Sequence, residues 1–339
     1  MRLFAAALLL SVVASSASAK DLDSTSVPMP GGGAGIGFDD LGYAPGLNKM
    51  LVPGGRTGRL FLVDPGTRKV SSVGGFTPEK DYKRGHGEGV TSADEGRGLL
   101  FGTDRNRGAV VAVDPKTGAA LASAKLSGGP DYVRYAAPTG ELWVSEPSAE
   151  KIELFTLSGG TAALTIAKAG EISVPGGPES LVIDAARGRA YAHTWKGESL
   201  AIGLKSRAVE ARWANGCTGS RGIALDETRG FLFAGCDEGK AVVLDAAHGG
   251  KVLSSLESGK GVDVIAYSER LRHLYLPGAD SATMAIIAVG DDGTLKLLKT
   301  LKTAKGAHCA AADESGGAWV CDPDAGRLLY FKDGGGASR

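Results

Sequence analysis

The segment Ala109-Val-Val-Ala-Val-Asp-Pro-Lys-Thr-Gly118 joins a short apolar run to an Asp-Pro turn. An apolar run, an acidic turn and a second short run together predict a β-hairpin. The same order recurs in Arg59-Leu-Phe-Leu-Val-Asp-Pro-Gly-Thr-Arg-Lys-Val70 and in Ala241-Val-Val-Leu-Asp-Ala-Ala-His-Gly-Gly-Lys-Val252. Three copies of one hairpin at distant positions indicate a chain that is built from repeats.

A second motif precedes these hairpins and places one polar residue just ahead of a short apolar strand. Gly177-Pro-Glu-Ser-Leu-Val-Ile-Asp184 and Gly129-Pro-Asp-Tyr-Val-Arg-Tyr135 are examples. The motif occurs seven times, and its polar residues are Asp39, Glu88, Asp131, Glu179, Arg221, Asp263 and His308, with steps of 49, 43, 48, 42, 42 and 45 residues. Four short strands in every ~40–50 residues are the signature of a β-propeller blade. The sequence therefore predicts an all-β, seven-bladed β-propeller in a single domain over residues 20–339.

The two ends of the chain predict how the last blade is completed. The chain ends soon after a third strand at 327–332, so the seventh blade lacks its fourth strand. Ser24-Thr-Ser-Val-Pro-Met-Pro30 precedes the first blade much as Glu171-Ile-Ser-Val-Pro175 precedes the fourth. We expect this N-terminal strand to close the last blade, because pairing the two ends removes exposed strand edges.

Residues 1–19 have the three parts of a secretory signal peptide. Arg2 supplies the positive start, an apolar run of 12 residues follows at 3–14, and Ala17-Ser-Ala19 has the small-x-small pattern of a cleavage site. This pattern predicts cleavage after Ala19 and a periplasmic or secreted protein. The apolar run is too short for a membrane-spanning helix, so we expect no membrane span.

Four cysteines, Cys217, Cys236, Cys309 and Cys321, fit an oxidising compartment. An even number of cysteines in a secreted protein favours disulfides. Four cysteines allow three pairings, and separations of 19 and 12 residues favour the sequence neighbours, Cys217 with Cys236 and Cys309 with Cys321. The alternative is a thiolate metal site, although the chain has no Cys-x-x-Cys spacing.

The charge balance limits the classes of partner. Lys and Arg number 38, as do Asp and Glu, and aromatic residues make up only 6% of the chain. A protein that grips nucleic acid through bulk charge needs a basic excess or a basic face. We therefore expect no nucleic-acid partner. We also expect the protein to be a monomer.

The chain resembles the YVTN-type β-propellers, bacterial repeat proteins with hairpins of the form strand–Asp-x-x-Thr-Gly–strand. Asp114-Pro-Lys-Thr-Gly118 is the best match to this hairpin, and the literal Tyr-Val-Thr-Asn strand is absent. The resemblance covers essentially all of the chain after the signal peptide. Related propellers include binding proteins, metal-dependent lactonases and streptogramin-type lyases, so the resemblance does not choose among these functions.

The resemblance implies that the first strand of each blade lines a central channel and begins at one of its faces. A ring of polar residues would then surround one mouth, comprising Asp39 or Asp40, Glu88, Asp131, Glu179, Arg221, Asp263 and His308, with Arg134 as a counter-charge. Such a ring of acids is costly unless a cation, a proton or an arginine balances it. The alternative is that the acids accept hydrogen bonds from backbone N–H groups in nearby turns. The loops after the second strands are expected to form an outer polar rim, which comprises Asp104, Arg105, Glu146, Pro147, Trp195, Lys196, Asp237, Glu238, Asp280 and Asp322. Trp195 there either stacks on a sugar or another ring or packs between blades.

These residues support three hypotheses about function. The first is a protein that binds a small ligand or a divalent cation at the mouth, with Asp131, Glu179 and Asp263 as metal ligands; Ca²⁺ is favoured over Zn²⁺ because it takes six to eight oxygen ligands. The second is a metal-dependent, lactonase-like hydrolase or lyase in which His86 or His308 moves a proton. For both histidines the alternative is an ordinary polar role in a loop. The third is a protein–protein interaction scaffold with a periplasmic partner.

Overall fold

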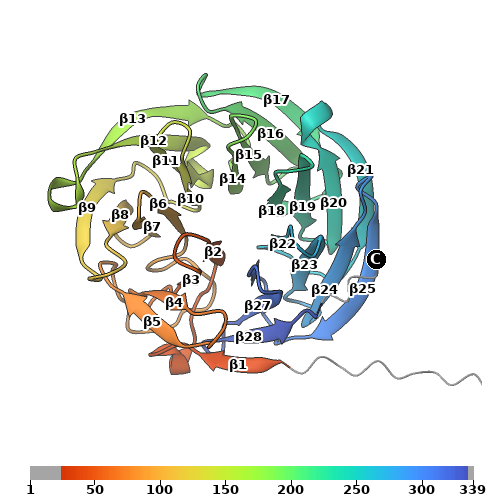
Figure 1. Cartoon of the computed structure of the whole chain (residues 1–339), viewed down its shortest axis with the longest axis horizontal. Coiled ribbons are helices and arrows are strands. Elements are labelled where there is room, and N and C mark those ends of the chain that lie inside the picture. Colours follow the sequence, from red (N-terminus) through yellow and green to blue (C-terminus); the bar gives the residue numbers. More distant parts are fainter. Residues whose placement is uncertain (1–23, 335–339) are drawn as a thin grey trace, which may run out of the picture.

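The computed structural model describes residues 24–334, so the predicted signal peptide lies outside the described residues. Seven antiparallel, four-stranded sheets form a ring around a central axis (Figure 1). The prediction of an all-β, seven-bladed propeller is confirmed. Within residues 24–334 no helix is long and apolar enough to cross a membrane.

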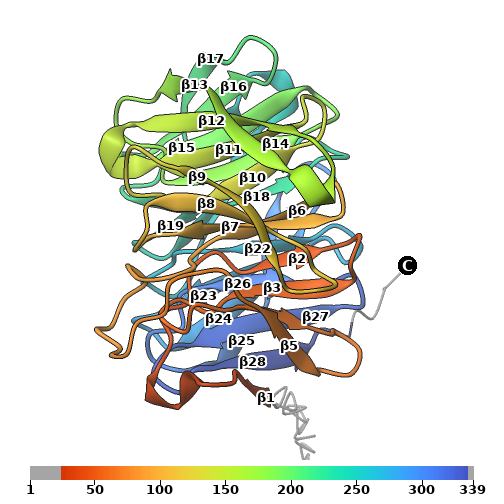
Figure 2. The same ribbon diagram turned by 90° about the vertical axis from the view of Figure 1, so that its left-hand side faces the viewer.

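Each blade runs from an inner strand at the channel to an outer strand at the rim (Figure 1). Blades 1 to 3 consist of β2 (Gly42–Ala44), β3 (Lys49–Pro53), β4 (Leu60–Val63) and β5 (Val70–Val73); β6 (Ala93–Gly96), β7 (Leu99–Asp104), β8 (Ala109–Val113) and β9 (Ala120–Lys125); and β10 (Val133–Ala136), β11 (Glu141–Glu146), β12 (Lys151–Ser158) and β13 (Thr165–Ser173). In the side view, the blade of β6 to β9 lies between its two neighbours in the chain (Figure 2).

The next three blades repeat this order. They consist of β14 (Ser180–Asp184), β15 (Arg189–Thr194), β16 (Glu198–Gly203) and β17 (Ala208–Ala214); β18 (Ser220–Asp226), β19 (Phe231–Cys236), β20 (Lys240–Asp245) and β21 (Lys251–Glu257); and β22 (Ala266–Ser268), β23 (His273–Gly278), β24 (Thr283–Val289) and β25 (Leu295–Lys302). The helical segments are short 3₁₀ turns, η1 (Gly32–Ala34), η2 (Pro147–Ala149), η3 (Thr161–Ala163) and η4 (Ala246–His248).

The seventh sheet contains both ends of the described chain. Its order is β1 (Thr25–Pro28), β28 (Arg327–Lys332), β27 (Gly317–Asp322) and β26 (Ala310–Ala312). β1 is antiparallel to β28, with Thr25 opposite Tyr330 and Pro28 opposite Arg327. β1 thus lies at the outer position of this sheet, which a blade's fourth strand takes in the other six.

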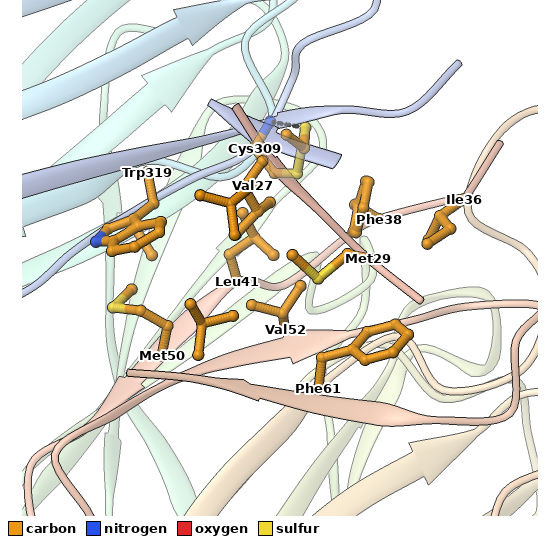
Figure 3. Packing of buried hydrophobic residues seen from close by; sticks show 14 of the residues in the cluster. Val27, Met29, Ile36, Phe38, Leu41, Met50, Val52, Phe61, Cys309 and Trp319 are labelled. Carbon is orange, nitrogen blue, oxygen red and sulfur yellow. Dashed lines mark hydrogen bonds between the residues drawn. A yellow bond between two sulfur atoms is a disulfide. The ribbon is translucent and has the colours of Figure 1, made fainter. Parts of the chain in front are cut away.

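The core is divided into seven hydrophobic clusters, and each lies between two successive blades. Figure 3 shows the cluster between blades 7 and 1, where Trp319 from β27 faces Met50 from β3 and Val27 from β1. Middle strands such as β7 and β8 are buried along their whole length, because each of their faces packs against a neighbouring blade. Outer strands such as β9 are half-exposed, as expected at the rim.

Both cysteine pairs favoured by the sequence separations lie at disulfide distance. The Cα atoms of Cys217 and Cys236 are 5.3 Å apart, and those of Cys309 and Cys321 are 5.6 Å apart. Each pair links the approach to an inner strand with the second strand of the same blade. The preferred pairing of sequence neighbours is therefore confirmed.

The packing between blades 7 and 1 gives a stability test at Trp319. This side chain is fully buried, and its Nε1 donates a 2.7 Å hydrogen bond to Asp313. Trp319→Ala leaves a large cavity and removes the Trp319 hydrogen bond to Oδ2 of the buried Asp313, so we expect a loss of about 3–5 kcal/mol in the free energy of unfolding, measured by chemical denaturation. Leu298→Ala on the exposed outer strand β25 is the control and should cost about 0.5 kcal/mol or less. A loss for Trp319→Ala as small as that for Leu298→Ala would contradict the view that packing between blades 7 and 1 stabilises the fold.

Candidate functional site

One mouth of the channel gathers polar side chains from all seven blades. Six of them are residues that the resemblance implies at this mouth, just before or at the start of an inner strand, and blade 2 contributes His86 in place of the expected Glu88. Ion pairs, ring stacking and shared cavity walls connect the set, which consists of Asp39, His86, Asp131, Glu179, Arg221, Asp263 and His308. We call this set the mouth cluster.

The backbone before the inner strands presents these residues to the channel. The N–H group of Asp131 donates to Ser145 O at 2.8 Å, and that of Glu179 donates to His193 O at 2.9 Å. Each residue is therefore tied to the end of its own blade while its side chain lies beyond the sheet. Gly177 adopts a φ of +76°, and a Cβ there would lie 2.8 Å from Pro147 O, so this turn before Glu179 requires glycine.

An arginine from the second blade holds two acids of the mouth cluster together. Arg105 follows β7, and its Nη2 lies 3.1 Å from Asp39 Oδ2 and also contacts Asp131 Oδ1. Burial and the neighbouring Asp39 charge raise the pKa of Asp131 well above its usual range, although Arg105 opposes this shift. Burial also acts to raise the pKa of Asp39, but the charge and hydrogen bond of His86 and the charge of Arg105 lower it overall. The two acids therefore differ in protonation tendency although one guanidinium contacts both.

His86 is the cation at the centre of the cluster. Its Nδ1 lies 3.0 Å from Asp39 Oδ2, and its Nε2 lies 3.7 Å from Asp263 Oδ2. The Asp39 charge, against the effect of burial, raises the pKa of His86 to about 9. His86 is therefore an imidazolium at neutral pH and neutralises part of the acid ring.

His308 is held by backbone carbonyl groups on both sides of its ring. Nδ1 lies 2.7 Å from Gly306 O and Nε2 lies 2.9 Å from Phe38 O. A carbonyl oxygen only accepts hydrogen bonds, so both contacts are satisfied together only when both ring nitrogens carry protons. The ring also stacks on His86, with centroids 5.5 Å apart. His308 therefore braces blade 7 against the segment that leads into blade 1.

Glu179 is the centre of the opposite side of the cluster. Its Oε1 accepts a hydrogen bond from Arg221 Nη1, and its Oε2 accepts one from Trp195 Nε1. Burial raises the pKa of Glu179 to about 7, and Arg221 partly offsets this effect. Glu179 can thus exchange a proton near neutral pH. Its other partner, Trp195, is 40% exposed.

Two cavities open beside the mouth cluster, and His86 borders both. The larger, of about 500 Å³, is lined by Asp263 and His308 together with Tyr82 and Lys305. The smaller, of about 390 Å³, is lined by side chains from blades 2 to 5, namely Arg105, Asp131, Glu179, Trp195 and Arg221. Both volumes are typical of sites for small ligands.

Three residues, Glu88, Arg105 and Trp195, lie elsewhere than expected from the sequence, and Arg134 pairs with an acid of the predicted ring. Glu88 lies outside both cavities and forms a 2.6 Å ion pair with Lys83, because its loop turns His86, two residues earlier, into the mouth. Arg134 does act as a counter-charge, but its partner is Asp40, at 2.6 and 2.9 Å. Arg105 and Trp195 were expected at the outer rim and instead line the smaller cavity. Both residues directly follow the second strand of a blade, and this position could have indicated a place near the mouth. No sequence pattern showed in which direction their side chains point.

The three carboxylates predicted as metal ligands, Asp131, Glu179 and Asp263, do not lie close enough together to form one group of ligands. Among residues 24–334, two groups of three potential ligands have all their ligand atoms within 4.8 Å of one another, and they are His86 with Asp263 and His308, and His308 with Cys309 and Cys321. Asp131 and Glu179 belong to neither group and contact Arg105 and Arg221 instead. Any cation site at the mouth would therefore use histidine nitrogen as well as carboxylate oxygen.

Comparisons with known proteins identify the fold and no family. No family model matches the chain, and no curated protein matches it. Among solved structures, a chain of a mitotic checkpoint complex has a TM-score of 0.74 at 12% identity, with 98% of each chain covered. A chain of hydrazine synthase from Kuenenia stuttgartiensis has a TM-score of 0.71 at 12% identity, covering 96% of this chain and 99% of that one. A β-propeller domain from Myceliophteria thermophila has a TM-score of 0.71 at 12% identity, covering 91% of this chain and 99% of that one. Likeness at this identity shows the propeller fold alone.

The charge state of His86 can be measured by NMR titration of the histidine side chains. We expect a midpoint of about 9 for His86, and a midpoint of about 4 for His193, whose burial lowers its pKa. Asp39→Asn removes the main cause of the high value, so the His86 midpoint should fall toward 6.5. A wild-type midpoint already near the ordinary value for histidine would contradict the ion pair with Asp39.

The same ion pair predicts a change of stability with pH. A pKa raised from 6.5 to about 9 gives a stabilisation that is complete below pH 6.5 and lost as the pH rises through 9. His86→Gln lacks this contribution, so the difference in unfolding free energy between wild type and variant should narrow between these values. His86 is partly exposed, which limits the expected change to the order of 1 kcal/mol. If denaturation experiments show the same difference in unfolding free energy between wild type and variant across this pH range, His86 has the same pKa in the folded and unfolded states.

Proposed function

We propose that this protein binds a small polar ligand at the mouth of the central channel, in the periplasm or outside the cell. One observation carries the proposal, namely that all seven blades direct a polar side chain to the same end of the channel, beside two cavities of about 500 and 390 Å³. Convergent polar groups around a concave site are the general mark of a ligand-binding site. The predicted signal peptide and the two cysteine pairs support the location.

The charges of the mouth cluster favour an organic ligand over a divalent cation. Asp131 and Glu179 already contact arginines, and His86 carries a positive charge against Asp39. A cation bound by His86, Asp263 and His308 would have to displace the His86 proton and at least one carbonyl contact of His308. Asp39 behind His86 Nδ1 does resemble the carboxylate that supports a metal-bound histidine, so a divalent cation remains the second ligand to test.

A hydrolase or lyase is the alternative function, and Glu179 is the residue that favours it. A carboxyl group with a pKa of about 7 is suited to donate and accept a proton at neutral pH. The histidines are less suited to this role, because His308 contacts a carbonyl oxygen through each ring nitrogen and His86 is held protonated by Asp39. A protein-interaction scaffold, a common use of the propeller fold, is the third candidate and would not depend on the mouth.

A thermal-shift panel tests the proposal directly. The probes are neutral mono- and disaccharides, free amino acids, linear polyamines, and the chlorides of Ca²⁺, Mn²⁺ and Zn²⁺. A ligand at 100 times its Kd adds about 2.7 kcal/mol of stability, so a bound probe should raise the melting temperature by a few degrees. We expect at least one class to do so, with the shift reduced in Asp263→Asn or Glu179→Gln, according to the cavity that holds the probe.

Asp291→Asn is the matched control, because its carboxylate is 81% exposed and lies outside both cavities. A melting temperature that no probe raises, or that rises equally in all three variants, would contradict a ligand site at the mouth. Lactones added to the same samples test the alternative, because turnover that is lost in Glu179→Gln would establish a hydrolase.

A further inference from the structure

We infer that the smaller cavity is a subsite for one ring of a neutral saccharide, which packs its apolar face on Trp195 and directs its hydroxyl groups to the paired charges opposite. This inference rests on the proposed function and names the ligand class for one side of the mouth. It depends on three features of the cavity, which are an exposed indole ring in a fixed orientation, two carboxyl–arginine pairs, and positive charges that already contact acidic side chains.

Trp195 is an apolar surface that the fold leaves uncovered at the cavity wall. Its side chain is 40% exposed, whereas Trp143 and Trp319 are completely buried. The hydrogen bond from Nε1 to Glu179 Oε2 holds one edge of the ring, so the orientation of the indole is set before any ligand arrives. A preorganised aromatic ring contributes contact area at a low cost in conformational entropy. The C–H groups on one face of a pyranose ring match such a surface.

The polar side of the cavity offers donors and acceptors in adjacent pairs. Arg221 contacts Glu179, and Arg105 contacts Asp131. A guanidinium has five N–H donors and an ionised carboxylate accepts about four hydrogen bonds, so each pair keeps unused capacity after its internal contact. Neighbouring hydroxyl groups on a sugar ring each donate and accept, and two of them can therefore bridge a carboxylate and an adjacent arginine.

The charge of the cavity favours a neutral ligand. Each arginine already contacts a carboxyl group, and His86 borders the cavity with its charge directed to Asp39 and Asp263. An ionic ligand would have to compete with these existing contacts for Arg105, Arg221 or the carboxyl groups, whereas the hydroxyl groups of a neutral ligand can join them. A purely apolar ring would cover Trp195 but leave the four charged groups without new partners, at a cost in desolvation.

Intrinsic tryptophan fluorescence tests this subsite with glucose, galactose, mannose, N-acetylglucosamine, maltose and cellobiose as probes. We expect at least one of these sugars to give a saturable change in emission, because Trp195 loses its contact with water. Trp195→Ala should weaken binding by about tenfold or more, measured by calorimetry, whereas Trp195→Phe keeps an aromatic face and should lose less. Trp213→Phe, in the outer strand β17, is the matched control and should bind as the wild type does.

The outcomes separate this inference from the proposed function. Binding of a neutral sugar that weakens in Trp195→Ala and in Glu179→Gln supports the subsite. Binding of amino acids, polyamines or divalent cations alone, with no response to any of the six sugars, overturns the subsite and leaves a ligand site at the mouth in place. Sugar binding that is unchanged in Trp195→Ala, in a variant whose melting temperature equals that of the wild type, also overturns it.

Discussion

Packing between neighbouring blades holds the propeller together and sets where its side chains meet. A single four-stranded sheet of this chain has two apolar faces, and it can bury both only between two other sheets. Seven clusters, one at each boundary between blades, satisfy this requirement around the whole ring. The cluster between blades 7 and 1 joins residues from the two ends of the chain, such as Val27 and Trp319, and thereby removes the last exposed face.

The closed ring also forces charged side chains together. Each inner strand starts at the same mouth, so any polar residue placed ahead of the strand lies near its counterparts from the other blades. The acids tolerate this proximity because counter-charges reach them from neighbouring blades, as Arg105 reaches Asp39 and Asp131 and Arg221 reaches Glu179. The local excess of carboxylates expected from the repeat is therefore largely neutralised within the protein, and this neutralisation favours a polar organic ligand over a metal ion.

Particular residues show where prediction from the sequence succeeded and where it did not. The repeat predicted Asp131, Glu179 and Asp263 in equivalent places, because a regular spacing along the chain maps onto a regular rotation about the axis. Glu88 and His86 are two residues apart in one glycine-containing loop, and only the path of that loop decides which of them enters the mouth. Arg105 and Trp195 follow second strands at corresponding points of blades 2 and 4, and their long side chains lean toward the channel rather than outward.

Patterns along the chain were enough to predict seven blades and the residues ahead of their inner strands, and the cysteine separations favoured the two pairs that the structure brings together. These properties follow from local patterns, since apolar runs, turn residues and short separations act within one blade. The folded protein alone shows which charges pair, which histidine is held protonated, and which indole ring stays uncovered beside a cavity. Those properties arise between blades that are far apart in the chain, where burial and the distance to a counter-charge depend on side-chain directions that no local pattern contains.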